Sequence, residues 1–164
     1  MESPSVQREG PSLENGWPGL RTPPPTSLSS PSCSRRLTSS AAARQEYAIT
    51  LRSDGRYVGE CGLMPRVGPS ALEIGYWVDV RYARRGIATE AAGLLVEAAF
   101  EQPETTRVEI HCDEANVASA GVPARLGFEL DRVEWDEIEA PSEIGRSMTW
   151  TVDREAWLKS RTSA

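Results

Sequence analysis

The sequence predicts a mixed α/β domain with β-hairpins at its ends and one parallel βαβ unit in its middle. Residues 72–80 carry apolar or aromatic side chains at every second position, which is typical of a strand. A helical pattern over residues 87–101 follows at once, with a polar stripe and small or branched apolar residues elsewhere. A second strand pattern covers residues 107–112. Because a strand, a crossover helix and a strand form a βαβ unit, we expect these two strands to be parallel neighbours.

Size, charge and the rare residues exclude several classes of protein. The 164 residues suffice for one domain, and the net charge of -6 argues against binding to nucleic acid. No apolar run could cross a bilayer, and the first thirty residues lack the apolar centre of a signal peptide. We therefore expect no membrane partner and a cytoplasmic location. The three cysteines are far apart, and His111 is the single histidine and is expected to be an ordinary strand residue, so we expect no metal site.

The first part of the chain differs in composition from the rest. Residues 1–43 hold seven of the twelve prolines and ten serines, and their sparse apolar residues follow neither helical nor strand spacing. Such a segment cannot bury enough apolar surface to offset the entropy of ordering, so we predict that it is disordered. The ordered domain is expected over residues 44–160.

A β-hairpin is predicted at the start of the domain. Residues 47–51 and 56–63 have strand patterns, and the Asp54-Gly55 pair between them is a strong turn signal. A loop then leads into the central strand, turn and helix.

The second half of the domain follows from shorter patterns. After the strand at 107–112, a short helix is expected over residues 117–126, with Gly127 as the left-handed residue that ends it. Residues 128–138 and 146–152 are predicted strands. A C-terminal helix through Leu158 completes the domain.

The turn between the central strand and its helix suggests a phosphate site. Its sequence is Arg-Arg-Gly-Ile-Ala over residues 84–88, and the helix follows directly. The first turn of a helix offers unpaired backbone N–H groups and the positive end of the helix dipole, which together bind phosphate. Gly86 allows the chain to approach a ligand closely, because it has no Cβ. The alternative is an ordinary βα turn with two solvated arginines.

Three stretches of the sequence fall in a familiar order. They are residues 74–78, residues 84–91, and residues 116–119 with 125–128. Each is weak alone, but in order and spacing across residues 45–160 they resemble the GNAT superfamily of acyl-CoA-dependent N-acetyltransferases. Within it they are most similar to the branch of the ribosomal-protein N-terminal acetyltransferases RimJ and RimL. The resemblance implies the GNAT fold without its usual first strand and two helices, whose place the Pro/Ser-rich segment takes.

The resemblance also implies acetyl-CoA as co-substrate, with no metal. The start of the helix would bind its pyrophosphate, through Arg84, Arg85, Gly86, Ile87, Ala88 and Thr89. The amides of the pantetheine arm would pair, like an added strand, with the backbone near Trp77, Val78 and Asp79. A backbone N–H in that stretch could also polarise the thioester carbonyl. Asn116 would help to hold the same arm, or would cap its own helix.

Transfer to an amine needs a base for the ammonium proton and an acid for the departing thiolate. The resemblance implies Glu73 as the base, since many relatives carry a glutamate on this strand, and Glu60 on the neighbouring strand is a second candidate. Ser119 is implied as the acid, because it matches the RimL branch, whereas the place of the family's common tyrosine is Pro123 here. The alternatives are a surface carboxylate for Glu73 and a helix N-terminal residue bonded to backbone for Ser119.

Three functions remain open. The first is an N-acetyltransferase that moves an acetyl group to a primary amine, either a protein N-terminus or a small amine, by direct attack in a ternary complex. The second is a catalytically silent acyl-CoA-binding domain. The third is a nucleotide-phosphate-binding module unrelated to acyl transfer, which would give no reason for the spacing of Asn116, Ser119 and Gly127-Phe128. An open sheet without its first strand has an exposed edge, so a homodimer is also expected.

Overall fold

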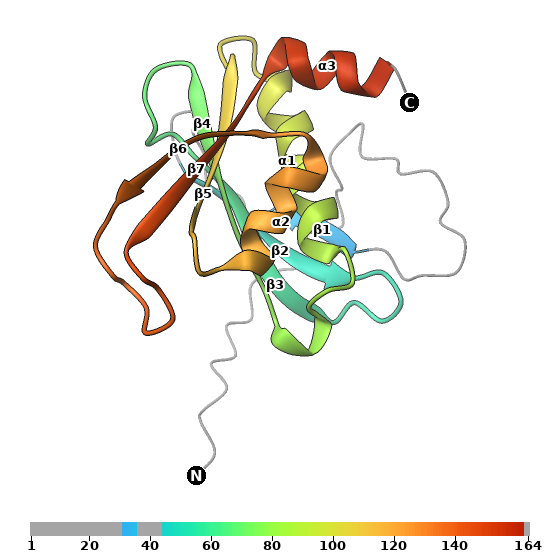
Figure 1. The fold of residues 1–164 in the computed structure, drawn as a ribbon. Helices are drawn as coiled ribbons and strands as arrows, with labels where there is room; N and C mark the ends of the chain where they lie inside the picture. The colour runs from blue at the N-terminus through green and yellow to red at the C-terminus, as the bar shows by residue number, and fades with distance from the viewer. Residues whose placement is uncertain (1–30, 36–43, 163–164) are drawn as a thin grey trace.

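The computed structural model describes residues 31–35 and 44–162, in which seven strands form one mixed sheet (Figure 1). The strand order in the sheet is β1-β2-β3-β4-β5-β7-β6. The strands are β1 (Pro31–Arg35), β2 (Gln45–Leu51), β3 (Tyr57–Met64), β4 (Ala71–Val78), β5 (Arg107–Asp113), β6 (Glu129–Trp135) and β7 (Arg146–Asp153). The helices are the 3₁₀ helix η1 (Val80–Tyr82) and the α-helices α1 (Ile87–Glu101), α2 (Val117–Leu126) and α3 (Arg154–Thr162).

The predicted central unit is present. β4 and β5 are parallel neighbours joined by α1, while the other neighbouring strands are antiparallel. The predicted hairpin is confirmed as well, because β2 pairs with β3 across the turn that contains Asp54 and Gly55. The mixed α/β class is therefore confirmed. β6 stops at Trp135, before the end of the strand predicted there, and α3 runs on to Thr162.

α1 and α2 lie side by side on one face of the sheet (Figure 1). The core forms between this face and α1, whose buried residues are Ile87, Ala91, Ala92, Leu95, Val96, Ala98, Ala99 and Phe100. Along β4, Leu72 and Ile74 belong to this core. Side chains alternate along a strand, so Glu73 between them projects to the opposite face. β4 thus separates an apolar face toward the helices from a face that carries ionisable groups.

Arg154, at the junction of β7 and α3, holds the C-terminal end of α1. Its guanidinium donates to the backbone carbonyls of Phe100, of Gln102 at 2.7 Å and of Thr105 at 2.6 Å. No N–H group within a helix donates to its last carbonyl groups, and the helix dipole at that end favours a cation. Arg154 therefore fixes the loop that leads from α1 into β5.

The sheet has a strand at the edge where none was expected. Pro31–Arg35 lies within the segment predicted to be disordered, yet it forms β1 and pairs antiparallel with β2. The predicted absence of a first strand is therefore wrong for these residues, and the edge of β2 is not free. A strand is stabilised mainly by its cross-strand partner, which local composition does not report. The rest of residues 1–43 lies outside the described residues, and within the described ranges no α-helix precedes α1.

Candidate active site

The turn before α1 has an uncommon backbone conformation. Arg84 and Gly86 have positive φ angles, 62° and 80° respectively. The left-handed region costs a non-glycine residue about 1–2 kcal/mol, and such conformations concentrate at functional sites. The first hydrogen bond of α1 runs from Glu90 N–H to Gly86 C=O at 2.9 Å. The three N–H groups before Glu90 therefore have no acceptor within the helix. We call residues 84–89 the cradle.

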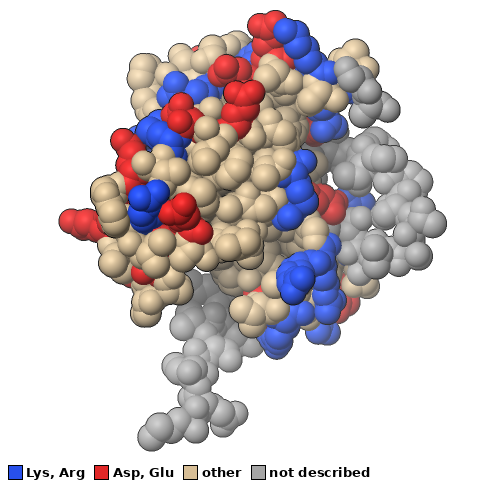
Figure 2. Space-filling view, viewed as in Figure 1, with Lys and Arg blue, Asp and Glu red and all other residues tan. Residues whose placement is uncertain are grey.

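Residues 84–86 of the cradle are exposed, and two of them are positively charged, whereas Ile87 is buried. Arg84 and Arg85 are both exposed, and the guanidinium of Arg85 lies 5.2 Å from the ring centroid of Tyr82. Figure 2 shows Lys and Arg side chains gathered over the part of the surface where α1 begins. No side chain caps α1 at Gly86, and no atom lies within 4 Å of the position that a Cβ on Gly86 would occupy. Backbone N–H donors, two arginines and open space suit a doubly charged pyrophosphate.

Asp79 starts η1 and is already paired within the chain. Its carboxylate accepts hydrogen bonds from the backbone and the guanidinium of Arg81, which lower the pKa of Asp79 to about 2. Its N–H donates to the carbonyl of Val58 at 2.8 Å, and its carbonyl accepts from the N–H of Tyr82 at 2.8 Å. Backbone N–H groups alternate in direction along a strand, so Trp77 faces β3 as Asp79 does, whereas Val78 faces the β5 side. A pantetheine arm that pairs with this strand would therefore meet the backbone of Val78 rather than that of Asp79.

β4 and β5 pair along only part of their length. Their parallel register runs from Ala71 opposite Arg107 to Glu73 opposite Glu109. Beyond that point β4 continues to pair with β3, and β5 continues to pair with β7 up to Asp113. In the described part of the chain, the facing edges of the two strands have no registered pairing past Glu73 and Glu109. We call this divergence, residues 74–78 against 110–113, the β4–β5 fork.

The fork offers backbone amides to an extended ligand. Buried N–H and C=O groups need partners, and an amide-bearing chain can supply them as an added strand. Trp77 and Val78 lie at the open end of the fork, and the cradle follows them after η1. A strand edge without registered pairing therefore lies next to a helix N-terminus with N–H groups that have no acceptor within the helix. Pantetheine and pyrophosphate occur in this order in coenzyme A.

Ser119 and Tyr76 meet on the helix side of the fork. The Tyr76 hydroxyl donates to the Ser119 carbonyl at 3.1 Å and accepts from Ser119 Oγ at 3.2 Å. Asn116 caps α2, because its Oδ1 accepts from the Ser119 N–H at 3.0 Å. Burial raises the pKa of Tyr76 to about 12, so this hydroxyl remains a proton donor at neutral pH. Burial likewise raises the pKa of the neighbouring Cys112 thiol, which argues against a thiolate there.

Two buried carboxylates occupy the opposite face of the sheet. Glu73 and Glu109, partners in the parallel ladder, are 4% and 2% exposed. Both oxygens of Glu73 accept from the Arg66 guanidinium, with Nε 2.6 Å from Oε2. Arg107 pairs with Glu109 Oε1 at 2.8 Å. Buried carboxylates are stable only when they are paired, so each arginine compensates one of them.

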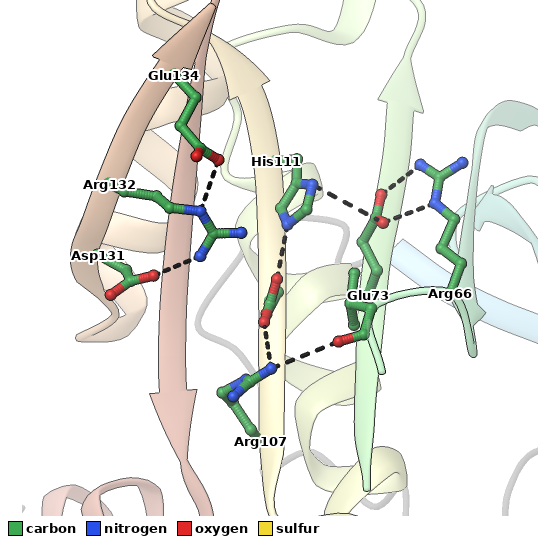
Figure 3. Close-up of polar contacts among 9 residues, drawn as sticks. Arg66, Glu73, Arg107, His111, Asp131, Arg132 and Glu134 are labelled. Carbon is green, nitrogen blue, oxygen red and sulfur yellow. Dashed lines mark hydrogen bonds and ion pairs between the residues drawn. The ribbon is translucent and has the colours of Figure 1, made fainter. Parts of the chain in front are cut away.

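His111 lies between the two carboxylates, and Figure 3 shows its ring directed toward Glu73. Its Nε2 is 2.8 Å from Glu109 Oε2, and its Nδ1 is 3.9 Å from Glu73 Oε2. The ring was expected to be that of an ordinary strand residue, and the acidic pair around it was missed. The signal was present, because Glu109 and His111 are two residues apart and share one face of a strand. What the sequence did not reveal was that Glu73 would lie beside them.

His111 also lines a cavity of about 500 Å³. Arg66, Arg107 and Arg132 contribute to its wall, together with Glu109 and residues of β6 and β7. Arg132 is held by Asp131 and by Glu134 at 2.7 Å, as Figure 3 also shows. The cavity is thus polar and lies on the face of the sheet opposite α1 and α2.

The two residues expected to transfer protons lie on opposite faces of the sheet. Glu73 faces the polar cavity side, whereas Ser119 contacts Tyr76 on the helix side. The β4–β5 fork lies between them, so a group lodged in the fork could be reached from both faces. Glu60 shares the face of Glu73, and its carboxylate accepts from Trp77 Nε1 at 3.4 Å. No cluster of His, Cys, Asp and Glu suited to a metal occurs among the described residues.

The described residues also contain no helix long and apolar enough to span a membrane.

Comparisons with known proteins give the site its context. The chain is 43% identical to YdaF of Bacillus subtilis (strain 168), whose name assigns it provisionally to the ribosomal N-acetyltransferases, over 34% of this chain and 31% of YdaF. A crystal structure of a probable acetyltransferase has a TM-score of 0.62 and 28% identity, covering 70% of this chain and 64% of that one. RimL, a ribosomal L7/L12 α-N-protein acetyltransferase solved with coenzyme A, shares the fold with a TM-score of 0.60 and 21% identity, covering 69% and 63% of the two chains.

The matched segments cover 31% to 58% of the length of the curated relatives. A family description, the acetyltransferase (GNAT) domain, matches residues 13–129, which is more than half of the 164 residues. Its match begins inside the segment predicted to be disordered. The cradle, the fork and the matched domain agree, and the chain belongs to the GNAT acetyltransferase family.

Proposed function

We propose that this chain transfers the acetyl group of acetyl-CoA to a primary amine by direct attack in a ternary complex. The observation that supports the proposal most strongly is the β4–β5 fork, which has the cradle at one end and ionisable groups on both faces. Acetyl-CoA would supply an activated acetyl thioester. The chain would supply binding, orientation and proton transfer.

The donor would lie along the fork. Its pyrophosphate would contact the cradle, through Arg84, Arg85, Gly86, Ile87, Ala88 and Thr89. Its pantetheine amides would lie along Trp77 and Val78 and pair with the backbone of Val78, which faces the fork. The Val78 N–H would stabilise the charge that develops on the carbonyl oxygen. Asp79 would contribute less than expected, because its backbone is already paired. The Asn116 amide that caps α2 would lie beside the arm on the helix side.

The acceptor would approach from the cavity on the opposite face. We propose that Glu73 contributes its carboxylate to the removal of the proton from the acceptor ammonium. Ser119 is proposed as the acid that protonates the departing thiolate. Because both oxygens of Glu73 are bonded to Arg66, a proton could reach Glu73 directly only after one of these bonds opens. Ser119 Oγ donates to the Tyr76 hydroxyl, so it would have to turn away from Tyr76 to give its proton to the thiolate.

The acceptor class is a further part of the proposal. The names of YdaF and RimL point to ribosomal proteins as their substrates, so a protein N-terminus is the first acceptor to test here. A cytoplasmic location agrees with such a substrate and remains a prediction. The homodimer also remains a prediction, although β1 covers the edge on which it was based.

Two measurements test the proposal. Calorimetric titration with acetyl-CoA should show binding, and absence of heat at millimolar acetyl-CoA would refute the whole assignment. Thiol release with a panel of peptides that begin with serine or alanine, and of small amines, should then show turnover. Binding without turnover for any acceptor would instead identify a silent acyl-CoA-binding domain.

A further inference from the structure

The His111–Glu109 pair has the geometry of an oriented base. His111 Nε2 lies 2.8 Å from Glu109 Oε2, and the Glu109 carboxylate can only accept a hydrogen bond. The proton of a neutral ring is therefore assigned to Nε2, and Nδ1 carries the lone pair. A carboxylate that fixes the tautomer of a histidine in this way is the arrangement that prepares an imidazole to accept a proton.

The environment of Nδ1 differs from that of Glu73. The side chain of His111 is 29% exposed and lines the cavity, whereas the side chain of Glu73 is 5% exposed and has both oxygens bonded to Arg66. Nδ1 lies 3.9 Å from Glu73 Oε2, which is too long for a hydrogen bond but close enough for electrostatic attraction once Nδ1 has taken a proton. An incoming ammonium in the cavity would therefore meet His111 before it could reach the carboxylate of Glu73.

The position of His111 on β5 suits a reaction in the fork. The parallel register that ends at Glu73 and Glu109 would, if continued, place His111 opposite Gly75 at the start of the fork. The next residue of β5, Cys112, faces the helix side near Ser119. His111 and Ser119 thus lie on opposite sides of the same short stretch of the fork.

We propose that His111, oriented by Glu109, is the residue that takes the proton from the acceptor ammonium, with Glu73 stabilising the imidazolium that forms. This inference rests on the proposed N-acetyltransferase function and assigns the base step within it. Glu109 is a positioning residue, because it acts through His111.

The proton and bond changes balance. The ammonium gives one proton to His111 Nδ1, and the freed nitrogen lone pair forms the C–N bond to the acetyl carbon as the C–S bond breaks. The sulfur leaves with the electron pair of that bond and takes a proton from Ser119. The second proton lost by the nitrogen replaces the one that Ser119 gave, and His111 releases its proton to solvent through the cavity.

Five carboxylates and three arginines surround His111. Glu109 and Arg107 lie on its own strand, Glu73 on β4, and Arg66 on the loop before β4. On the far side of the cavity, β6 contributes Asp131 and Arg132, and β7 contributes Asp153 at its end. Glu134, also on β6, is bonded to Arg132. Since each buried carboxylate already has an arginine, a positive charge on His111 would add attraction to both without leaving either unpaired.

The test compares His111→Gln with a control, Glu101→Gln, which removes an exposed carboxylate at the C-terminal end of α1, away from the cavity and the cradle. His111→Gln should lower kcat by about 100-fold, in line with the loss of a general base. Its Kd for acetyl-CoA should stay within about threefold of native, which also shows that the variant folds. Glu101→Gln should retain native kcat and Kd. The acceptor panel includes methylamine, because this small amine is an ammonium ion at neutral pH and needs little space in the cavity.

Two readouts separate a proton-transfer role from a structural one. The acidic limb of the kcat–pH profile should be lost in His111→Gln and displaced in Glu109→Gln. Added imidazole should restore part of the turnover of His111→Ala, because it can occupy the vacated space and accept the proton. Native-like kcat in His111→Gln, an unchanged acidic limb, or no rescue by imidazole would each overturn the inference.

The failure of this inference differs from the failure of the proposed function. Absence of acetyl-CoA binding by the native protein refutes both. Binding and turnover by the native protein, with undiminished turnover in His111→Gln, refutes the role of His111 alone. Binding without transfer even to methylamine refutes catalysis and the role of His111 while leaving the donor site intact.

Discussion

Gly86→Ala separates a ligand-binding role of the cradle from a structural one. Gly86 has a φ of 80°, and no atom lies within 4 Å of the position that its Cβ would take. Gly127, at the C-terminal end of α2, has the same φ and equally open surroundings. The two glycines are therefore matched in backbone strain. They differ in that Gly86 precedes the helix N-terminus proposed to bind pyrophosphate.

The expected magnitudes follow from these surroundings. Alanine in the left-handed region should lower the free energy of unfolding by about 1 kcal/mol at either position. At Gly86 the added methyl group would also stand in the space proposed for a phosphate. Hydrogen bonds to a charged group are worth about 1.5–3 kcal/mol each, so the loss of one should weaken the Kd for acetyl-CoA by about 10- to 100-fold.

Urea unfolding and calorimetric titration of both variants provide the assay. Gly86→Ala and Gly127→Ala should lose similar stability, whereas only Gly86→Ala should lose affinity for acetyl-CoA. Equal affinities in the two variants, together with equal losses of stability, would refute the placement of the pyrophosphate at the cradle.

Three further predictions concern the catalytic groups and the scaffold. Ser119→Ala and Glu73→Gln should each lower kcat by about 10- to 100-fold with little change in the Kd for acetyl-CoA, as measured by thiol release and calorimetry. Burial raises the pKa of Tyr76 from 10.0 to about 12, so its contribution to stability is full below pH 10 and is lost as the pH rises through 12. Urea unfolding across this range should show an alkaline decline of about 2 kcal/mol in the native protein that Tyr76→Phe lacks. Arg154→Leu leaves carbonyls at the end of α1 without their donor and should lower the free energy of unfolding by about 2–3 kcal/mol, again measured in urea, while the Kd for acetyl-CoA is unchanged.

Each of these predictions has a contrary outcome. Native turnover in both Ser119→Ala and Glu73→Gln would contradict their proposed roles. Parallel alkaline declines in the native protein and in Tyr76→Phe would show that the hydroxyl does not resist ionisation in the folded state. Unchanged stability in Arg154→Leu would mean that solvent satisfies the carbonyls at the end of α1.

Local pattern was sufficient to predict the central unit of the fold. The alternation along β4 and the helical spacing of α1 report burial directly, because each follows the period of its own element. The positive φ of Gly86 and of Gly127 also agrees with their predicted roles at a helix start and a helix end. These features depend on residues that are close in sequence.

Features that depend on distant partners were not predictable in the same way. β1 is held by its pairing with β2, and its composition alone indicated disorder. The fork arises because β4 remains paired with β3 and β5 with β7 beyond the point where β4 and β5 stop pairing with each other. The sequence of either strand alone does not indicate where that pairing ends. The environment of His111 likewise required the parallel register that brings Glu73 beside Glu109. Glu73, Glu109 and His111 could be identified in the sequence, but their proximity in the fold could not.

The most direct test of the account is calorimetric titration of the native chain with acetyl-CoA. We expect binding at one site per chain with a Kd below about 100 µM, in competition with free coenzyme A. No heat of binding at about 1 mM acetyl-CoA, from protein shown to be folded, would contradict the assignment of the fork and the cradle to this co-substrate.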